Sequence, residues 1–131
     1  VALRNPAIDN LTRSVSRGGH LSLVTPSLES SLYASSQLIE WNLRSGMKPA
    51  AAIKAGHHNN AKDLQQGIVT IDGIPTKHFL REDLIAHLEQ RNMRIKEIRK
   101  IEYPWITEFN DPPKWMKKPL PWDWLVLAQR R

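Results

Sequence analysis

Histidine, serine and acidic side chains are the groups of this 131-residue chain that could carry chemistry, but their spacing argues against an active site. His57 and His58 are adjacent, and no acidic pair stands three or four residues away to complete a helical metal-ligand set. None of the serines at residues 14–45 lies in the Gly-x-Ser-x-Gly turn that exposes a nucleophile. The absence of cysteine excludes thiolate catalysis and cysteine-ligated zinc. The sequence therefore predicts no enzymatic activity, no catalytic residue, no metal, no cofactor and no small-molecule substrate.

Basic side chains are the second group with a chemical consequence, because they outnumber the acidic ones by 19 to 13. The net charge of +6 suits an anionic partner such as RNA. Basic residues cluster on a long helix expected from Leu80 to Tyr103 and again near the C-terminus. We predict phosphate contacts from Arg91, Arg94, Lys96, Arg99, Lys100, Lys114, Lys117 and Lys118.

Tryptophan is concentrated in the last quarter of the chain, where prolines are also frequent. Prolines at 104, 112, 113, 119 and 121 argue against long regular structure there. Large aromatic side chains are rarely left in solvent, so the segment is expected to bury them against another surface. We predict that residues 104–131 form an extended arm that docks on neighbouring protein subunits through Trp105, Trp115, Trp122 and Trp124. The alternative is that the arm wraps back over its own domain.

Two helices and a hairpin are the main elements expected to position these groups, and the two helices are expected to pack together through apolar residues that include Leu32 and Leu84. A helix at Pro26–Arg44 follows from its apolar stripe, with Thr25 as N-cap and Pro26 in the first turn. Asp72-Gly73 predicts a tight hairpin turn within residues 68–76. The 80–103 helix is expected to be continuous, with a break at Asn92 as the alternative. The predicted fold class is α+β, mainly helical, with domains at 1–19 (N-terminal extension), 20–103 (small helical domain) and 104–131 (extended arm).

Shorter elements and the N-terminus complete this interpretation. A short strand is expected at 21–24, and short helices at 49–55 and 61–66. Apolar residues recur every four positions from Leu3 to Val15, with arginines between them and one acid, Asp9. This arrangement is typical of a segment derived from an organellar transit peptide, which predicts the mitochondrial matrix. No apolar run approaches the length that would cross a bilayer.

Two local resemblances to known families imply nucleic-acid partners. The run from Ala61 to Gly73 resembles the end of an S4-type RNA-binding module, in which a helix, a glycine and a hairpin present basic residues to RNA. Asp72 stands where that family has Asn, and Lys62 is the remaining basic residue of the helix. Residues 75–84 are similar to the wing-to-helix turn of excisionase-like winged helices, which implies DNA contact.

These observations favour a non-catalytic structural subunit of a large RNA-containing assembly. The hypothesis is a mitochondrial ribosomal protein that contacts rRNA and neighbouring subunits. One alternative is a soluble accessory subunit of a respiratory or ATP-synthase complex. The other is a small winged-helix DNA-binding protein.

Overall fold

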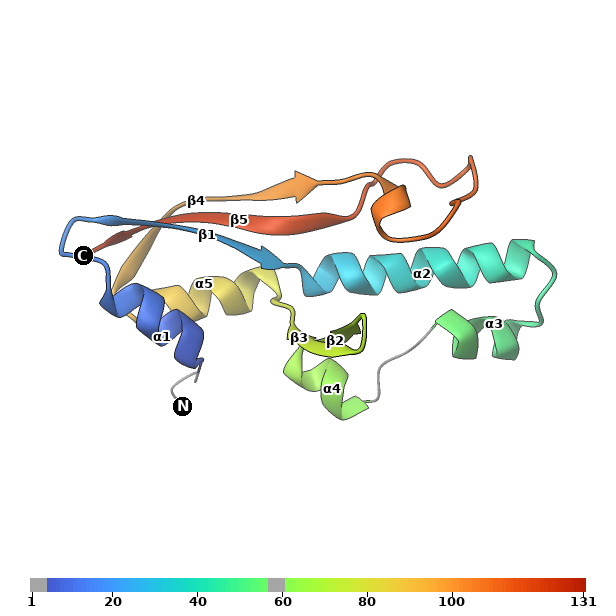
Figure 1. Cartoon of the computed structure of the whole chain (residues 1–131), viewed down its shortest axis with the longest axis horizontal. Coiled ribbons are helices and arrows are strands. Elements are labelled where there is room, and N and C mark those ends of the chain that lie inside the picture. The colour runs from blue at the N-terminus through green and yellow to red at the C-terminus, as the bar shows by residue number, and fades with distance from the viewer. Residues whose placement is uncertain (1–4, 57–60) are drawn as a thin grey trace.

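A three-stranded antiparallel sheet and two helices beneath it carry the main core of the chain (Figure 1). The computed structural model describes residues 5–56 and 61–131. Its strands are β1 (His20–Pro26), β2 (Ile68–Ile71), β3 (Ile74–Lys77), β4 (Met93–Glu102) and β5 (Trp122–Arg130). Its helices are α1 (Pro6–Arg13), α2 (Leu28–Arg44), α3 (Pro49–Gly56), α4 (Ala61–Gln66) and α5 (Arg81–Glu89), with a 3-10 turn at Trp105–Thr107. The predicted α+β class with a β-hairpin is confirmed.

Strand β5 lies at the centre of the sheet, between β1 and β4, and every second side chain on it is buried. Trp122, Trp124, Val126 and Ala128 face α1 and α5 in the main core. The prediction that the C-terminal segment lacks regular structure is therefore wrong. The prolines stop at Pro121, and the nine residues after it are free to pair on both edges. Leu125 and Leu127 add apolar side chains on the other face, so residues 124–128 form a short continuous apolar run in the sequence.

Strand β4 replaces the second half of the helix expected at 80–103. Helix α5 ends at Glu89, and Asn92 has a φ of 62°, which turns the chain back along β5. A β-bulge between Ile95 and Glu97 adds one residue to β4. Ile95 and Ile98 therefore face the core together, opposite Ala128 and Val126. Their three-residue spacing, which suggested a helix, is produced by this bulge in a strand.

Helix α2 is confirmed close to its predicted bounds, but its start and its buried face differ. Ser27, rather than Thr25, is the N-cap, and its hydroxyl accepts a hydrogen bond from the Ser30 N–H at 3.0 Å. Thr25 and Pro26 instead complete β1. Leu32, expected in the core, is 40% exposed. The predicted packing of the two principal helices is also wrong, because α5 packs on β4 and α1.

The opposite face of the sheet is partly apolar and carries no labelled helix (Figure 1). Val24 on β1 is 53% exposed, and Ile101 on β4 is 40% exposed. Alternation along the strands places both on the face opposite the main core. The sheet is thus covered on one side among the residues that the structure describes.

Two segments connect this core to the rest of the fold. Helix α1, part of the predicted N-terminal extension, buries Ile8 in the main core. Helices α3 and α4 lie where short helices were predicted, and α3 packs on α2. His57 and His58 fall outside the described residues. Over the described ranges, no helix is both long enough and apolar enough to cross a membrane.

The β2–β3 hairpin turns at Asp72-Gly73, whose φ angles are 49° and 79°. Positive φ at both positions is the turn that the sequence predicts. A β-carbon at Gly73 would meet no atom within 4 Å, so only backbone strain opposes a side chain there. We expect Gly73→Val to lower the free energy of unfolding by more than about 1 kcal/mol. Chemical denaturation should show a smaller loss for Gly73→Asn, because Asn tolerates this conformation; equal losses would contradict the assignment.

Candidate functional site

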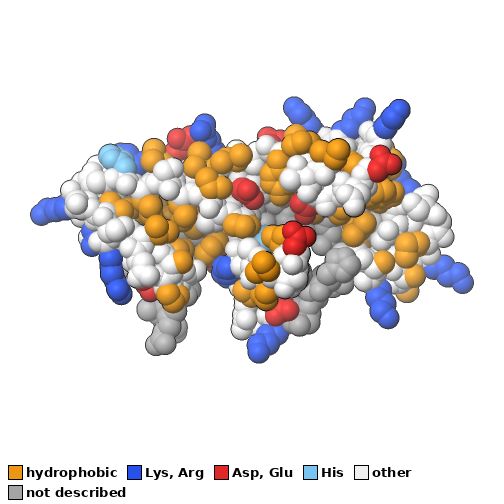
Figure 2. All heavy atoms as spheres, viewed as in Figure 1, with side chains coloured by type: hydrophobic (Ala, Val, Ile, Leu, Met, Phe, Trp, Pro, Cys, Tyr) orange, Lys and Arg blue, Asp and Glu red, His pale blue; other side chains and the backbone are white. Residues whose placement is uncertain are grey.

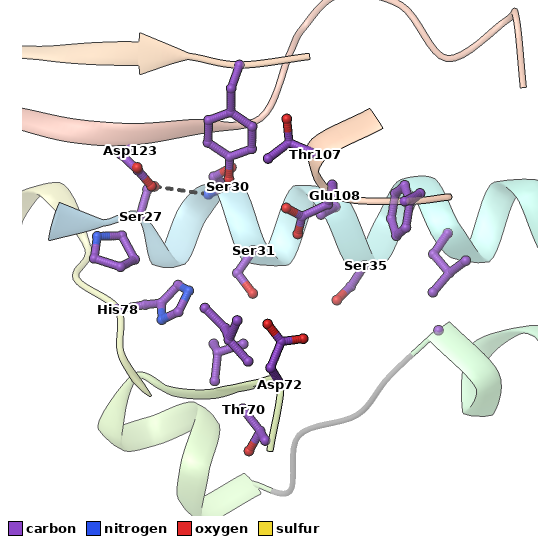
Figure 3. A pocket seen from close by; sticks show the side chains of 18 residues that line it. Ser27, Ser30, Ser31, Ser35, Thr70, Asp72, His78, Thr107, Glu108 and Asp123 are labelled. Carbon is purple, nitrogen blue, oxygen red and sulfur yellow. Dashed lines mark hydrogen bonds between the residues drawn. The ribbon is translucent and has the colours of Figure 1, made fainter. Parts of the chain in front are cut away.

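A cavity of about 680 Å³ lies where β1 passes into α2 and faces the β2–β3 hairpin (Figure 3). Its walls come from four parts of the chain that are distant in sequence. These are the start of α2, the hairpin with His78, the segment from Tyr103 to Phe109, and the first residues of β5. The cavity is therefore a product of the tertiary fold, formed at the carboxyl end of β1.

Serines of α2 form one wall because they recur along a single face of the helix. Ser27, Ser31 and Ser35 are spaced by four residues, and Ser31 and Ser35 point toward the hairpin (Figure 3). Ser30 is buried, and its hydroxyl accepts a hydrogen bond from the Trp122 N–H at 2.9 Å. This bond ties the start of β5 to α2 and fixes the upper edge of the cavity.

His78 projects into the cavity from the segment that follows β3 (Figure 3). Its backbone N–H donates to the Gly67 carbonyl at 2.7 Å, and its Nδ1 lies 3.1 Å from the Thr76 carbonyl. Gly67 has a φ of 71°, and a β-carbon there would lie 2.5 Å from the His78 carbonyl oxygen. Glycine is thus required at this position to hold His78. Burial is the main cause that lowers the pKa of His78, so the imidazole is neutral near pH 7.

Acidic side chains and a tyrosine form the opposite wall. Glu108 is exposed as a residue, but its carboxyl group is turned toward the cavity, where desolvation raises its pKa (Figure 3). Desolvation likewise raises the pKa of Asp123. Burial, followed by the neighbouring Glu108 and Asp123 carboxylates, raises the pKa of Tyr103 to about 12, and its hydroxyl interacts with Ser30 and Glu108. Tyr103 is therefore a neutral hydroxyl at physiological pH.

The segment that carries Glu108 is held on α2 by aromatic packing. Trp105 is buried with Ala34 and Met116 in a second, smaller core. Its ring stacks on Phe109 at 5.8 Å and meets Tyr33 at 6.0 Å, and its Nε1 donates to the Lys117 carbonyl at 2.8 Å. The position of the Glu108 carboxyl thus depends on the burial of Trp105.

Strand geometry distributes the basic residues predicted to contact RNA over several surfaces. Arg91 is partly buried and pairs with Asp9 at 2.6 Å, while its Nη1 donates to the His87 carbonyl. Arg94 and Arg99 lie on the open face of the sheet, whereas Lys100 faces Trp122, with Nζ 3.9 Å from the ring centre. Lys96 is at the bulge, and Lys114, Lys117 and Lys118 are exposed in the segment before β5. Figure 2 accordingly shows basic side chains at several separate places on the visible face.

The four tryptophans predicted to dock on a partner serve mainly the chain's own cores. Trp105, Trp122 and Trp124 are each less than 8% exposed. Trp115 is half-buried, and the Arg44 guanidinium lies 4.1 Å from its ring centre. Three of the four are therefore already enclosed within the molecule.

The residues that converge on the cavity were absent from the predicted set. Ser31 and Ser35 repeat every helical turn, and this polar stripe was the available signal. Asp72 was interpreted as a turn residue, which it is, but its carboxyl also points into the cavity (Figure 3). Among the described residues, no group of three His, Asp or Glu side chains is arranged to hold a metal ion.

Comparisons with known proteins find a likeness in fold alone. A scan against protein-family models finds no match, and a search of curated proteins finds none either. The fold is similar to the crystal structure of a SAM-dependent methyltransferase from Methanosarcina mazei, with a TM-score of 0.50 and 14% sequence identity. The match covers 94% of this chain and 49% of the other, so the chain spans about half the length of that protein. At this identity the likeness is one of fold.

Proposed function

We propose that this chain forms the acceptor-binding part of a SAM-dependent methyltransferase. The observation that carries the proposal is the coincidence of two features. The fold matches part of such an enzyme over nearly the whole chain, and its described residues line a cavity with both polar and apolar walls at the carboxyl end of β1.

The lining of the cavity supports acceptor binding rather than binding of the methyl donor. S-adenosylmethionine carries a carboxylate as well as two positive charges. The described lining includes Asp72, Glu108 and Asp123 but neither Lys nor Arg, so a donor carboxylate would have no cationic partner here. The residues present therefore do not fit the complete donor, and we assign the cavity to the acceptor.

Two side chains could accept a proton from the methyl acceptor or donate a hydrogen bond to it. The neutral imidazole of His78 can accept a hydrogen bond or a proton from an acceptor group in the cavity. The Tyr103 hydroxyl, held beside Ser30 and Glu108, can donate a hydrogen bond. In this role the chain orients the acceptor and removes its proton.

Membership of an RNA-containing assembly remains the second candidate function, and one observation favours it. Lys114, Lys117 and Lys118 are all exposed in one five-residue stretch beside the second core. Such lysines can contact phosphate without reading sequence. Three of the four tryptophans on which that hypothesis depended are enclosed in the chain's own cores. We therefore favour methyl-acceptor binding over a mitochondrial ribosomal role.

A bulky side chain in the cavity should separate these functions. We expect Ser35→Phe to abolish transfer of an isotopically labelled methyl group from S-adenosylmethionine to small acceptors, because the ring would fill the cavity beside Thr70 and Glu108. Ser36→Phe is the matched control, since Ser36 is exposed and does not line the cavity. Equal activity of the two variants, with both folded, would contradict the assignment of the site.

A further inference from the structure

We propose that the ligand of this cavity is a small amphiphilic cation, in which a protonated amine is attached to an apolar or aromatic body. The proposal rests on the proposed function only in naming this ligand as the methyl acceptor. The charge, the buried histidine and the apolar part of the lining each contribute to it.

Uncompensated negative charge is the first observation. Three carboxylates line the cavity, and they come from separate elements: Asp72 from the hairpin turn, Glu108 from the segment after β4, and Asp123 from β5. Among the ion pairs of residues 5–56 and 61–131, none involves these three side chains. A bound ammonium group would supply the missing partner, with charge-assisted hydrogen bonds to more than one carboxylate.

Buried His78 is an independent observation. The residue is 6% exposed, its ring points into the cavity (Figure 3), and its Nδ1 is near the Thr76 carbonyl. The other ring nitrogen has no hydrogen-bond partner among the described residues. This nitrogen is not one of the fully buried atoms that lack a partner, so it is open to the cavity, where an N–H of the ligand can donate to it.

Apolar side chains define the rest of the ligand. Leu38, Val69, Ile71 and Phe109 line the cavity beside its polar groups. Their contact with the apolar body of the ligand would contribute through burial of apolar surface. An inorganic cation would leave this part of the lining unused, so the geometry favours an organic amine.

Direct binding to three probes of one shape tests the charge requirement. Isothermal titration calorimetry with the whole chain would compare benzylamine, benzyl alcohol and benzoate at millimolar concentrations. We expect benzylamine to bind at least about tenfold more tightly than benzyl alcohol, and benzoate not to bind. Equal binding of the amine and the alcohol, or no binding of the amine, would overturn the proposal.

Neutral isosteres of the carboxylates test the assigned residues. Glu108→Gln and Asp123→Asn should each weaken benzylamine binding roughly tenfold and leave benzyl alcohol unchanged. Asp72→Asn keeps a residue that tolerates the φ of 49° and should act in the same direction even if the other two variants fold poorly. Glu97→Gln is the control, because Glu97 is exposed on β4 away from the cavity. Unchanged selectivity in the folded cavity variants would overturn the assignment.

Failure of the proposed function would give a different result from failure of this inference. Amine-selective binding without methyl transfer to any amine would retain the ligand class and reject the methyltransferase role. Methyl transfer to neutral acceptors without amine-selective binding would retain the role and reject the ligand class.

Discussion

Val126→Asp is expected to prevent the chain from folding. Val126 lies on the central strand β5, is 1% exposed, and packs in the main core between cross-strand partners Leu23 and Ile98. An unpaired carboxylate at this position costs several kcal/mol, which is a large part of the about 5–15 kcal/mol that stabilises a typical domain. Loss of the cooperative thermal transition, followed by circular dichroism, would confirm the expectation.

Val24→Asp is the matched control for this substitution. Val24 lies on the adjacent strand β1 but on the open face of the sheet, where it is 53% exposed. Its carboxylate would remain in contact with water, so we expect a change of less than about 1 kcal/mol. If Val126→Asp kept a native thermal transition, residues 122–130 would not be part of the core, which is what the extended-arm prediction states.

Trp105→Ala should lower the free energy of unfolding by about 3–5 kcal/mol, the usual cost of removing a buried tryptophan. The substitution removes stacking on Phe109 and the hydrogen bond from Nε1 to the Lys117 carbonyl. Because Trp105 anchors the segment that carries Glu108, we also expect loss of ligand binding in the cavity. Urea denaturation and calorimetry would measure the two effects separately.

Ile106→Ala provides the comparison within the same 3-10 turn. Ile106 is 69% exposed, so its truncation should change stability by less than about 0.5 kcal/mol and leave ligand binding intact. If both variants unfold at the same denaturant concentration, the second core does not stabilise the chain. The position of Glu108 would then have to depend on contacts other than those of Trp105.

The elements that local sequence determines were predicted well. Asp72-Gly73 requires a turn with positive φ, and Gly46, with a φ of 95°, follows the end of α2. The two strands of the main sheet that were missed depend on pairing with distant residues. The bulge in β4 gave Ile95 and Ile98 a helix-like spacing, and the apolar run of β5 becomes a central strand only between β1 and β4.

The candidate site was less predictable than the fold because no motif contains it. Ser31, Asp72, His78 and Glu108 come from separate elements, and each has an ordinary local explanation in the sequence. The basic residues, in contrast, are close together in the sequence but lie apart in the fold. Arg94 and Lys100 were expected on one helix, but the strand and its bulge place them on opposite faces of the sheet.

Mapping of a bound ligand onto the chain is the most direct test of the claim that this cavity is the functional site. The measurement is a titration of the isotopically labelled protein with benzylamine, followed by backbone amide chemical shifts. We predict that the largest shifts occur at Ser31, Ser35, Asp72, His78 and Glu108, with Val24 and Arg99 on the open face unchanged. Shifts confined to residues 114–118 or to the open face of the sheet would contradict the account.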